Sequence, residues 1–345
     1  MLKYVEVNGE RFEIKNNFLD LGLLDINNIS KIIHFDQIDV KHLELSSNNI
    51  SEIKGLDHLK GLEILNLSNN SVEELTGLDS LENLEILHLA SNQILEISGL
   101  DNLSNLKELY LRGNQIQKLG GLEKLYNLKK LDLSWNLINE IEGLESLQSL
   151  EVLWIAGNQL NKISGLKDLE NISVLNLAGN RIVEIKGLNH LENLKELYLN
   201  DNEIHKINNL DALKNLETLW ITSNKITEIE NLENCIKLEV LNLKSNQISE
   251  IKGLYSLINL NKLFLSENEI ESIKGLETLQ NLETLDLSDN RISKITGLES
   301  LMNLKDLWVS GNEIDQDLID TLGGLDSGGC ALDPLKFVQY CLVNL

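Results

Sequence analysis

Side chains able to do chemistry are few and scattered along this chain. The 345 residues include six histidines and three cysteines, Cys235, Cys330 and Cys341. No two cysteines have Cys-x-x-Cys spacing, and no two histidines have the i, i+4 spacing of a helical metal pair. Cys235 stands where leucine stands 22 residues earlier and later, so we expect a small buried hydrophobe there. These patterns predict no catalytic residue, metal site or cofactor, and we expect that the chain is not an enzyme.

Two further clusters favour an ordinary structural role. The glycine-rich segment 323–329 lacks the Lys-Ser/Thr ending of a phosphate-binding loop, which favours a flexible loop. Asp315, Asp317 and Asp320 could suggest a cation site, but solvated acids are the simpler interpretation. Cys330 and Cys341 could pair or bind a metal, although their spacing favours two incidental thiols.

A 22-residue period dominates the rest of the sequence. Leucine stands five residues before each asparagine of the period, and an apolar residue stands three before and two after. Self-similarity at such a period marks a solenoid, in which each repeat is one turn. The thirteen asparagines are Asn48, Asn70, Asn92, Asn114, Asn136, Asn158, Asn180, Asn202, Asn224, Asn246, Asn268, Asn290 and Asn312.

Each turn has a short strand, a bend and a return segment. Leu65 and Leu67 alternate with period two, so both side chains face the core from one strand, and stacked turns form a parallel sheet. Asn70 follows where the chain must bend, and its amide can satisfy backbone groups of its own and the neighbouring turn. From Val72 to Leu81 the apolar spacing is about three residues, which predicts 3₁₀ or irregular turns.

This pattern resembles the leucine-rich repeat family, in its 22-residue subclass. Within that subclass it is most similar to the regulatory leucine-rich-repeat subunit of type-1 protein phosphatase and to the internalin adhesins. The resemblance covers roughly residues 24–322. It implies an α/β fold: a right-handed, horseshoe-shaped solenoid with a parallel sheet on the concave side and 3₁₀ or irregular turns on the convex side.

The ends of a solenoid need covers, because no turn buries its apolar stripe alone. Asn8-Gly9 predicts a hairpin, so residues 1–20 are assigned to an N-terminal β-hairpin cap. Residues 21–39 are a degenerate first repeat in which Leu24 and Asn27 imitate the motif, and 40–315 hold the thirteen repeats. Residues 316–345 form a C-terminal cap, with a short helix that starts at Pro334 and packs through Leu335, Val338 and Leu342.

The charge balance limits the partners. Lys and Arg total 30 against 54 Asp and Glu, a net charge of −24, which excludes ordinary nucleic-acid binding. No apolar run reaches the length of about 18 residues that a membrane span needs. The start of the chain does not resemble a secretory signal, and sparse cysteines favour a reducing compartment. We therefore expect a cytoplasmic protein that is monomeric on its own.

The concave face carries the informative signal. Strand residues between the buried leucines point outward, and two outward columns lie four residues and one residue before each asparagine. An even spread of the fifteen aromatic residues would place about one in these 26 positions, yet seven are found, including all four tryptophans. Stacking between neighbours would also explain such rings, but most are two strands apart, so we favour contact with a partner.

Acids accompany the rings on this face. Nine acids face four bases, Arg112, Lys130, Lys244 and Lys262, which suits a folded protein partner with a basic patch. The predicted contact residues are Glu44, Glu108, Tyr110, Asp132, Trp135, Trp154, Glu196, Tyr198, Trp220, Phe264, Asp286, Asp306 and Trp308.

Three functions are compatible with these features. The first is a non-enzymatic protein-binding scaffold, in its sharper form a regulator of a phosphatase or another enzyme, because the phosphatase subunits that the chain resembles hold their enzyme with acids and aromatics of the concave face. The second is a fragment of a surface adhesin of internalin type. The third, an enzyme with an unrecognised site, is disfavoured because a solenoid offers an open groove in place of a pocket.

Overall fold

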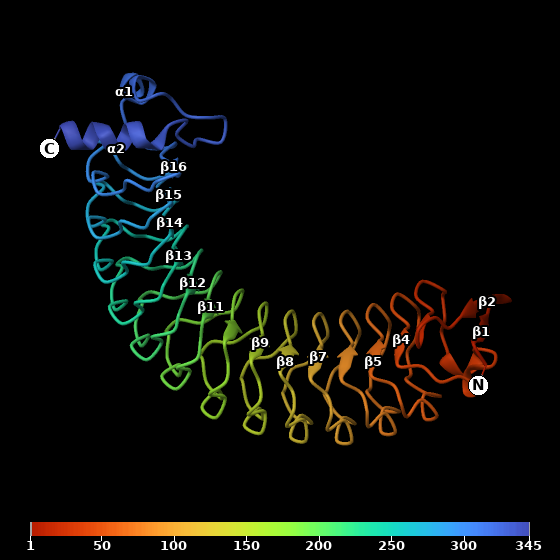
Figure 1. The fold of residues 1–345 in the computed structure, drawn as a ribbon. Helices are drawn as coiled ribbons and strands as arrows, with labels where there is room; N and C mark the ends of the chain where they lie inside the picture. Colours follow the sequence, from red (N-terminus) through yellow and green to blue (C-terminus); the bar gives the residue numbers. More distant parts are fainter. Residues whose placement is uncertain (1, 345) are drawn as a thin grey trace. The chain divides into compact units, whose positions relative to one another are not determined.

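Fourteen strands of three residues form the framework of the chain, and within each of its two compact units each strand runs parallel to its neighbour (Figure 1). The computed structural model describes residues 2–344. The chain divides into two compact units: the first extends to Leu160 and includes Ser164–Ile172, and the second comprises Asn161–Ile163 and the residues from Ser173 onward. The predicted parallel-sheet solenoid is confirmed.

Seven of these strands lie in each unit, stacked in sequence order. In the first unit they are β3 (Phe18–Asp20), β4 (His42–Glu44), β5 (Ile64–Asn66), β6 (Ile86–His88), β7 (Glu108–Tyr110), β8 (Lys130–Asp132) and β9 (Val152–Trp154). In the second they are β10 (Val174–Asn176), β11 (Glu196–Tyr198), β12 (Thr218–Trp220), β13 (Val240–Asn242), β14 (Lys262–Phe264), β15 (Thr284–Asp286) and β16 (Asp306–Trp308).

The core is a stack of aliphatic side chains with almost no contact with water. The central leucine of β5, Leu65, and the next inward residue, Leu67, are fully buried, and their equivalents in the other repeats are buried too. The return segment of the same turn closes through two successive i→i+3 bonds, from the N–H of Leu81 to Leu78 O and from the N–H of Leu84 to Leu81 O. These 3₁₀-type turns match the spacing expectation, and they turn a leucine inward every third residue.

The repeated asparagine joins each turn to the one before it. Asn136, 5% exposed, donates from Nδ2 to Leu133 O of its own turn at 3.0 Å and to Leu111 O of the preceding turn at 3.0 Å. Its Oδ1 accepts from the N–H of Ile116, also in the preceding turn, at 3.0 Å. One amide therefore satisfies three buried backbone groups where the chain leaves the strand and can no longer pair through the sheet.

A second asparagine ladder runs along the return segments. Asn83 Nδ2 donates to Lys60 O at 2.8 Å, and the same bond spans 23 residues at Asn105, Asn127, Asn215 and Asn259. These asparagines are exposed or half-buried, so water can compete for the amide. The sequence carries this column at the same 22-residue period, but the sequence analysis did not single it out.

Left-handed backbone is required once in every return segment. Gly77 has φ +94°, and a Cβ added there would lie 1.8 Å from the carbonyl oxygen of Ile53 in the preceding turn. Asn209 and Asn231 occupy the equivalent position with φ +55° and +59°. Their Nδ2 atoms donate to the carbonyls of the preceding turn, Ile185 O and Ile207 O, at 2.7 and 2.8 Å. The column therefore accepts glycine, or an asparagine that converts the close approach into a hydrogen bond.

An antiparallel hairpin covers the N-terminal end. Strands β1 (Tyr4–Val7) and β2 (Glu10–Glu13) meet through the turn Asn8-Gly9, with φ +52° and +83°. Two 3₁₀ helices follow β3, namely η1 (Ile29–Lys31) and η2 (Phe35–Gln37).

The register predicted for the first turn is wrong. Its strand is β3, where Leu19 pairs with Leu43, so the strand begins before the predicted boundary at residue 21. Leu24 is only half-buried and Asn27 is exposed. The contact of this turn with the next one is made by its backbone: Asn48 Oδ1 accepts from the N–H groups of Leu24 and Ile26. The other domain boundaries, at 39 and 315, stay predictions.

Two helices, α1 (Gln316–Thr321) and α2 (Pro334–Val343), belong to the C-terminal cap. The packed face of α2 differs from the predicted one: Phe337, Val338 and Cys341 are buried, whereas Leu335 and Leu342 are exposed. Phe337 has the largest fully buried side chain on the helix, and its face brings Cys341 four residues later into the core. The loop before α2 returns to the sheet, where the N–H of Ala331 donates to Leu307 O at 2.7 Å.

The asparagine ladder yields a stability prediction. Asn136→Ala leaves the Ile116 N–H and two carbonyls without their partner, which should cost about 1–3 kcal/mol of unfolding free energy. Urea unfolding followed by circular dichroism measures it. Asn139→Ala is the matched control, because Asn139 is an exposed asparagine of the same turn. Equal stability of the two variants would contradict the role given to the amide.

The left-handed column yields a second prediction. Gly77→Ala should lower stability by about 1–3 kcal/mol, because a Cβ at positive φ meets the Ile53 carbonyl. Gly77→Asn should cost less, since Asn209 and Asn231 already occupy the equivalent position. Thermal unfolding of the two variants side by side gives the comparison, and an asparagine variant weaker than the alanine variant would refute the explanation.

Candidate protein-binding face

The side of the strands that points away from the leucine core is named here the open face. Its residues lie six, four, two and one positions before each repeated asparagine. All thirteen predicted contact residues lie on it, six in the first unit, from Glu44 to Trp154, and seven in the second, from Glu196 to Trp308. Of these thirteen, Trp135 and Trp220 are the most exposed, at 60% and 37%, and the other eleven are half-buried. None belongs to the core, so each presents part of its side chain to solvent.

Trp135 has an unusual backbone conformation for a bulky residue. The position directly before each repeated asparagine is left-handed in every repeat, and glycine, serine, asparagine or aspartate fills it in most of them. Trp135 has φ +58°. Its indole lies beside Gly157, where a Cβ would come within 3.0 Å of the ring, and Arg112 Cζ lies 5.8 Å from the ring centroid. A large side chain in such a conformation costs energy, and this kind of local strain concentrates at functional sites.

Tyr110 is held by a network on β6, β7 and β8. Its ring stacks on His88 with centroids 4.6 Å apart, and its hydroxyl donates to Glu108 Oε2 at 2.5 Å. Lys130 Nζ lies 2.9 Å from the other oxygen, Glu108 Oε1. The sequence analysis did not recognise His88 as a partner, although it precedes Tyr110 by one repeat in the same column. Stacking therefore fixes this ring, in contrast to the free ring that was expected.

Burial and hydrogen bonding shift the pKa values in this network. Burial raises the pKa of Tyr110, and the bond to the Glu108 carboxylate raises it further. Burial alone would raise the pKa of Glu108, but the bonds from Tyr110 and Lys130 outweigh it and hold that pKa below its ordinary value. Burial lowers the pKa of His88, which disfavours its charged form. The network stabilises a neutral imidazole stacked on a neutral phenol at physiological pH.

Tyr198 repeats part of this arrangement in the second unit. Its hydroxyl donates to Glu196 Oε2 at 2.6 Å, and its ring meets Trp220 edge to face with centroids 6.0 Å apart. Burial, followed by the bond to Glu196, raises the pKa of Tyr198 to about 12. Trp220 remains 37% exposed despite that contact. These two rings, one repeat apart in the same column, are therefore in contact, and the Trp220 indole still stays partly open to solvent.

Acidity on the open face is concentrated in the second unit. Of the nine acids, the first unit holds Glu44, Glu108 and Asp132 beside two bases. The second unit holds six beside Lys244 and Lys262, and Lys244 Nζ is already engaged by Glu267 Oε1 at 2.9 Å. The six are Glu196, Asp201, Glu267, Asp286, Asp289 and Asp306. The second unit therefore presents the more negative surface to a partner.

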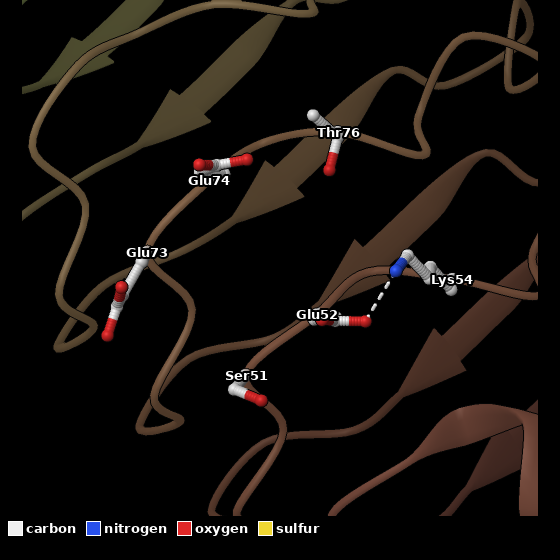
Figure 2. Close-up of a pocket in the computed structure, with 6 residues that line it drawn as sticks. All are labelled: Ser51, Glu52, Lys54, Glu73, Glu74 and Thr76. Atoms are coloured by element: carbon white, nitrogen blue, oxygen red, sulfur yellow. Dashed lines mark hydrogen bonds and ion pairs between the residues drawn. The ribbon is translucent and has the colours of Figure 1, made fainter.

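The depressions outside the open face include one lined by acids and a lysine. Figure 2 shows a polar depression of about 340 Å³ in the first unit, on the segments that follow two successive bends. Its lining has no histidine or cysteine, and one of its carboxylates, Glu52, is paired with Lys54 at 2.6 Å. Within residues 2–344, no three His, Cys, Asp or Glu side chains group closely enough to hold a metal ion. The lining residues are Ser51, Glu52, Lys54, Glu73, Glu74 and Thr76.

The three cysteines are free thiols. Cys235 is fully buried, and burial raises its pKa to about 12, so its thiolate is suppressed at neutral pH. Burial also raises the pKa of Cys330 and of Cys341. Each thiol is therefore a weak nucleophile in the folded chain.

The described helices are also too short and too polar for a bilayer: none in residues 2–344 could cross a membrane.

Comparison with known proteins agrees with the repeat geometry. The model of the leucine-rich repeat family, which describes two copies of the repeat, matches ten overlapping or adjacent stretches from residue 39 to residue 324. The chain belongs to the leucine-rich repeat family. No curated protein sequence matches this leucine-rich repeat protein at a significant level.

Solved structures similar to this leucine-rich repeat protein come from several sources. An internalin of Listeria monocytogenes is 29% identical over 84% of this chain and 86% of its own, with a TM-score of 0.77. A leucine-rich repeat protein of Leptospira interrogans is 26% identical over 88% and 92%, with a TM-score of 0.66. The ectodomain of a plant membrane receptor kinase from Arabidopsis thaliana, solved with Casparian strip integrity factor 2, is 25% identical over 79% of this chain and 39% of its own, with a TM-score of 0.55.

The Tyr198–Glu196 bond yields a pH prediction. The folded-state pKa of Tyr198 is about 12, above the ordinary value of 10.0, so the stabilisation is complete below pH 10 and is lost as the pH rises towards 12. Glu196→Gln removes the charge that disfavours the phenolate. We expect one tyrosine to ionise at lower pH in this variant, measured by ultraviolet absorbance titration. Tyr198→Phe identifies that step, and an unchanged titration in Glu196→Gln would contradict the coupling.

Proposed function

We propose that this leucine-rich repeat protein is a non-enzymatic scaffold that binds a folded protein through its open face. The observation that carries the proposal is the position of the tryptophans: all four lie on the open face, where two are exposed and two are half-buried. Trp and Tyr dominate the energetics of protein interfaces, and exposed rings gathered on one surface are typical of contact sites. The family membership supports a role in protein binding, and one structural neighbour, the plant receptor ectodomain, was solved with a protein partner.

The charge of the open face suggests what the partner looks like. Nine acids against four bases favour a partner with a basic patch, and steering between opposite charges would speed the encounter. A regulator of an enzyme such as a type-1 phosphatase is the finer form of this proposal. The acids and rings that share the outward columns of the open face support it. Binding of the purified phosphatase catalytic subunit tests it directly. With this function we propose that the protein is a monomer on its own and that it acts in the cytoplasm, which is a reducing compartment.

A surface adhesin of internalin type is the second candidate. The observation in its favour is the similarity to an internalin over 84% of this chain, with a TM-score of 0.77. The two candidates use the same open face, so they differ in where the protein acts. Fractionation of the cells that make it, with antibody labelling of intact cells, separates a surface location from the proposed cytoplasmic one.

The tryptophans provide the test of the scaffold. Trp154→Ala combined with Trp220→Ala, one residue from each unit, should weaken partner capture, because truncation of an interface tryptophan typically costs about 2 kcal/mol or more. Affinity capture from native lysate, quantified by mass spectrometry, is the measurement. Circular dichroism should report unchanged folding, since both side chains lie outside the core.

A matched control comes from the return segments. Tyr126 and Tyr255 are 54% and 62% exposed but lie away from the open face. Tyr126→Ala combined with Tyr255→Ala should leave capture unchanged. Capture that survives the tryptophan pair, or that falls equally in the tyrosine pair, would rule out the open face as the binding surface.

A further inference from the structure

One arrangement of side chains occurs once in each unit. In the first unit, Tyr110, Asp132 and Trp154 are direct neighbours on β7, β8 and β9. In the second, Phe264, Asp286 and Trp308 are direct neighbours on β14, β15 and β16. Both sets present a ring, a carboxylate and a ring, side by side in the column four residues before the repeated asparagine. The two sets lie seven repeats apart in the sequence and are named here the first and the second cradle.

The spacing of each cradle suits a flat cation. Adjacent strands lie about 4.8 Å apart, so the two rings stand about 10 Å apart with the carboxylate between them. A cation above the carboxylate then lies within about 6 Å of each ring, the range over which cation–π attraction acts. Between the two rings, this column holds only the short side chain of the aspartate.

Each central carboxylate uses only one of its oxygens within the protein. Asp132 Oδ1 accepts from the N–H of Ser134 at 2.9 Å, and Asp286 Oδ1 accepts from the N–H of Ser288 at 3.0 Å and from its hydroxyl at 2.6 Å. Within residues 2–344, Oδ2 of neither aspartate takes part in a hydrogen bond or an ion pair. The free oxygen of each carboxylate is therefore available to an incoming donor.

The backbone does not require a charge at this position. Asn176 and Asn242 occupy the same column in other repeats, and their Oδ1 atoms accept the same bond from Ala178 and Lys244 at 3.0 and 3.1 Å. An asparagine would therefore serve the fold equally well in the cradles. Among the thirteen repeats, aspartate stands in this column only at Asp132 and Asp286, each with a ring on both sides, while Asp20 of β3 lies in the same column beside Glu44 at the end of the sheet.

We propose that each cradle holds an arginine side chain of the protein partner. This inference rests on the proposed function and names the chemistry of what the open face recognises. The planar guanidinium can stack between the two rings while its N–H groups reach the free carboxylate oxygen, a combination that a compact ammonium makes less well. Recognition thus requires both the positive charge and the flat shape.

The second cradle is the stronger of the two. Asp306 on β16 and Asp289, three residues after β15, accompany it, and the open-face bases of this region are Lys262 on β14 and Lys244, which is engaged by Glu267. Near the first cradle stand Arg112 and Lys130, of which Lys130 is paired with Glu108. An arginine should therefore occupy Phe264–Asp286–Trp308 at lower concentration than Tyr110–Asp132–Trp154.

Fluorine NMR of the full chain tests the cradles. Replacing tryptophan by 5-fluorotryptophan gives one signal for each of the four tryptophans, assigned with single Trp→Phe variants. The probe is a short peptide of glycine and serine with one central arginine, compared with peptides that carry citrulline or lysine instead. The arginine peptide should shift the signals of Trp308 and Trp154. The chemical shift of Trp220 should not change, because its neighbours in the column are Tyr198 and Asn242, neither of which carries a carboxylate.

Asp286→Asn is the matched variant. It retains the bond from Ser288, so the thermal midpoint should not change, while the apparent Kd reported by Trp308 should rise about fivefold, as expected for a solvent-exposed ion pair. The Trp154 response in the same sample should remain unchanged, and Asp132→Asn should give the reverse pattern.

Four outcomes would overturn the proposal: no shift at millimolar peptide, an equal shift of Trp220, an equal response to citrulline, or an unchanged Kd in Asp286→Asn. A stronger response to the lysine peptide would overturn the choice of arginine. The result is separable from the scaffold test. Loss of partner capture in the tryptophan pair with no arginine response would refute the cradles and leave the scaffold standing, whereas an arginine response with capture unchanged would refute the scaffold.

Discussion

The amide of the repeated asparagine is the interaction on which the rest of the structure depends. A chain that leaves a three-residue strand exposes N–H and C=O groups at once, and in a stacked solenoid these groups are buried. Asn136 satisfies three of them and does so across two turns, as its equivalents do in the other repeats. Stacking thereby becomes a condition for satisfying the backbone, since a turn without a predecessor would leave two of those three bonds unmade.

The residues of the outward columns can differ from repeat to repeat, because other residues hold the fold. The inward leucines and the asparagine hold each turn, so residues four and one positions before the asparagine can vary without loss of the fold. Asn176, Tyr198 and Trp220 follow one another in a single column with the same strand geometry. The tolerance extends to Trp135, a large side chain in a left-handed bend that most other repeats fill with a small residue. Variation that the scaffold does not require is where selection for a partner can act.

Most of the framework could be predicted from the sequence, because period and strand alternation are one-dimensional signals. Leu65, Leu67 and Asn70 specify strand, core and bend on their own, and the open-face columns follow from the alternation. Features that depend on contacts between neighbouring turns could not be predicted from these signals. The left-handed bend at Trp135, the stack of His88 on Tyr110 and the shifted first strand at Leu19 all depend on contacts between turns. In α2, packing was decided by the side chain of Phe337, which spacing alone did not single out.

The loop that returns from the C-terminal cap has a consequence for solubility. Every strand of this fold offers the same row of donors and acceptors to its neighbour, so an uncovered last strand would accept the first strand of another molecule and begin a fibre. The Ala331 N–H occupies the Leu307 carbonyl at that edge. A polypeptide made of near-identical modules needs its terminal strand covered, and here the cap loop pairs with the edge of β16, so this edge no longer offers that acceptor to a second molecule.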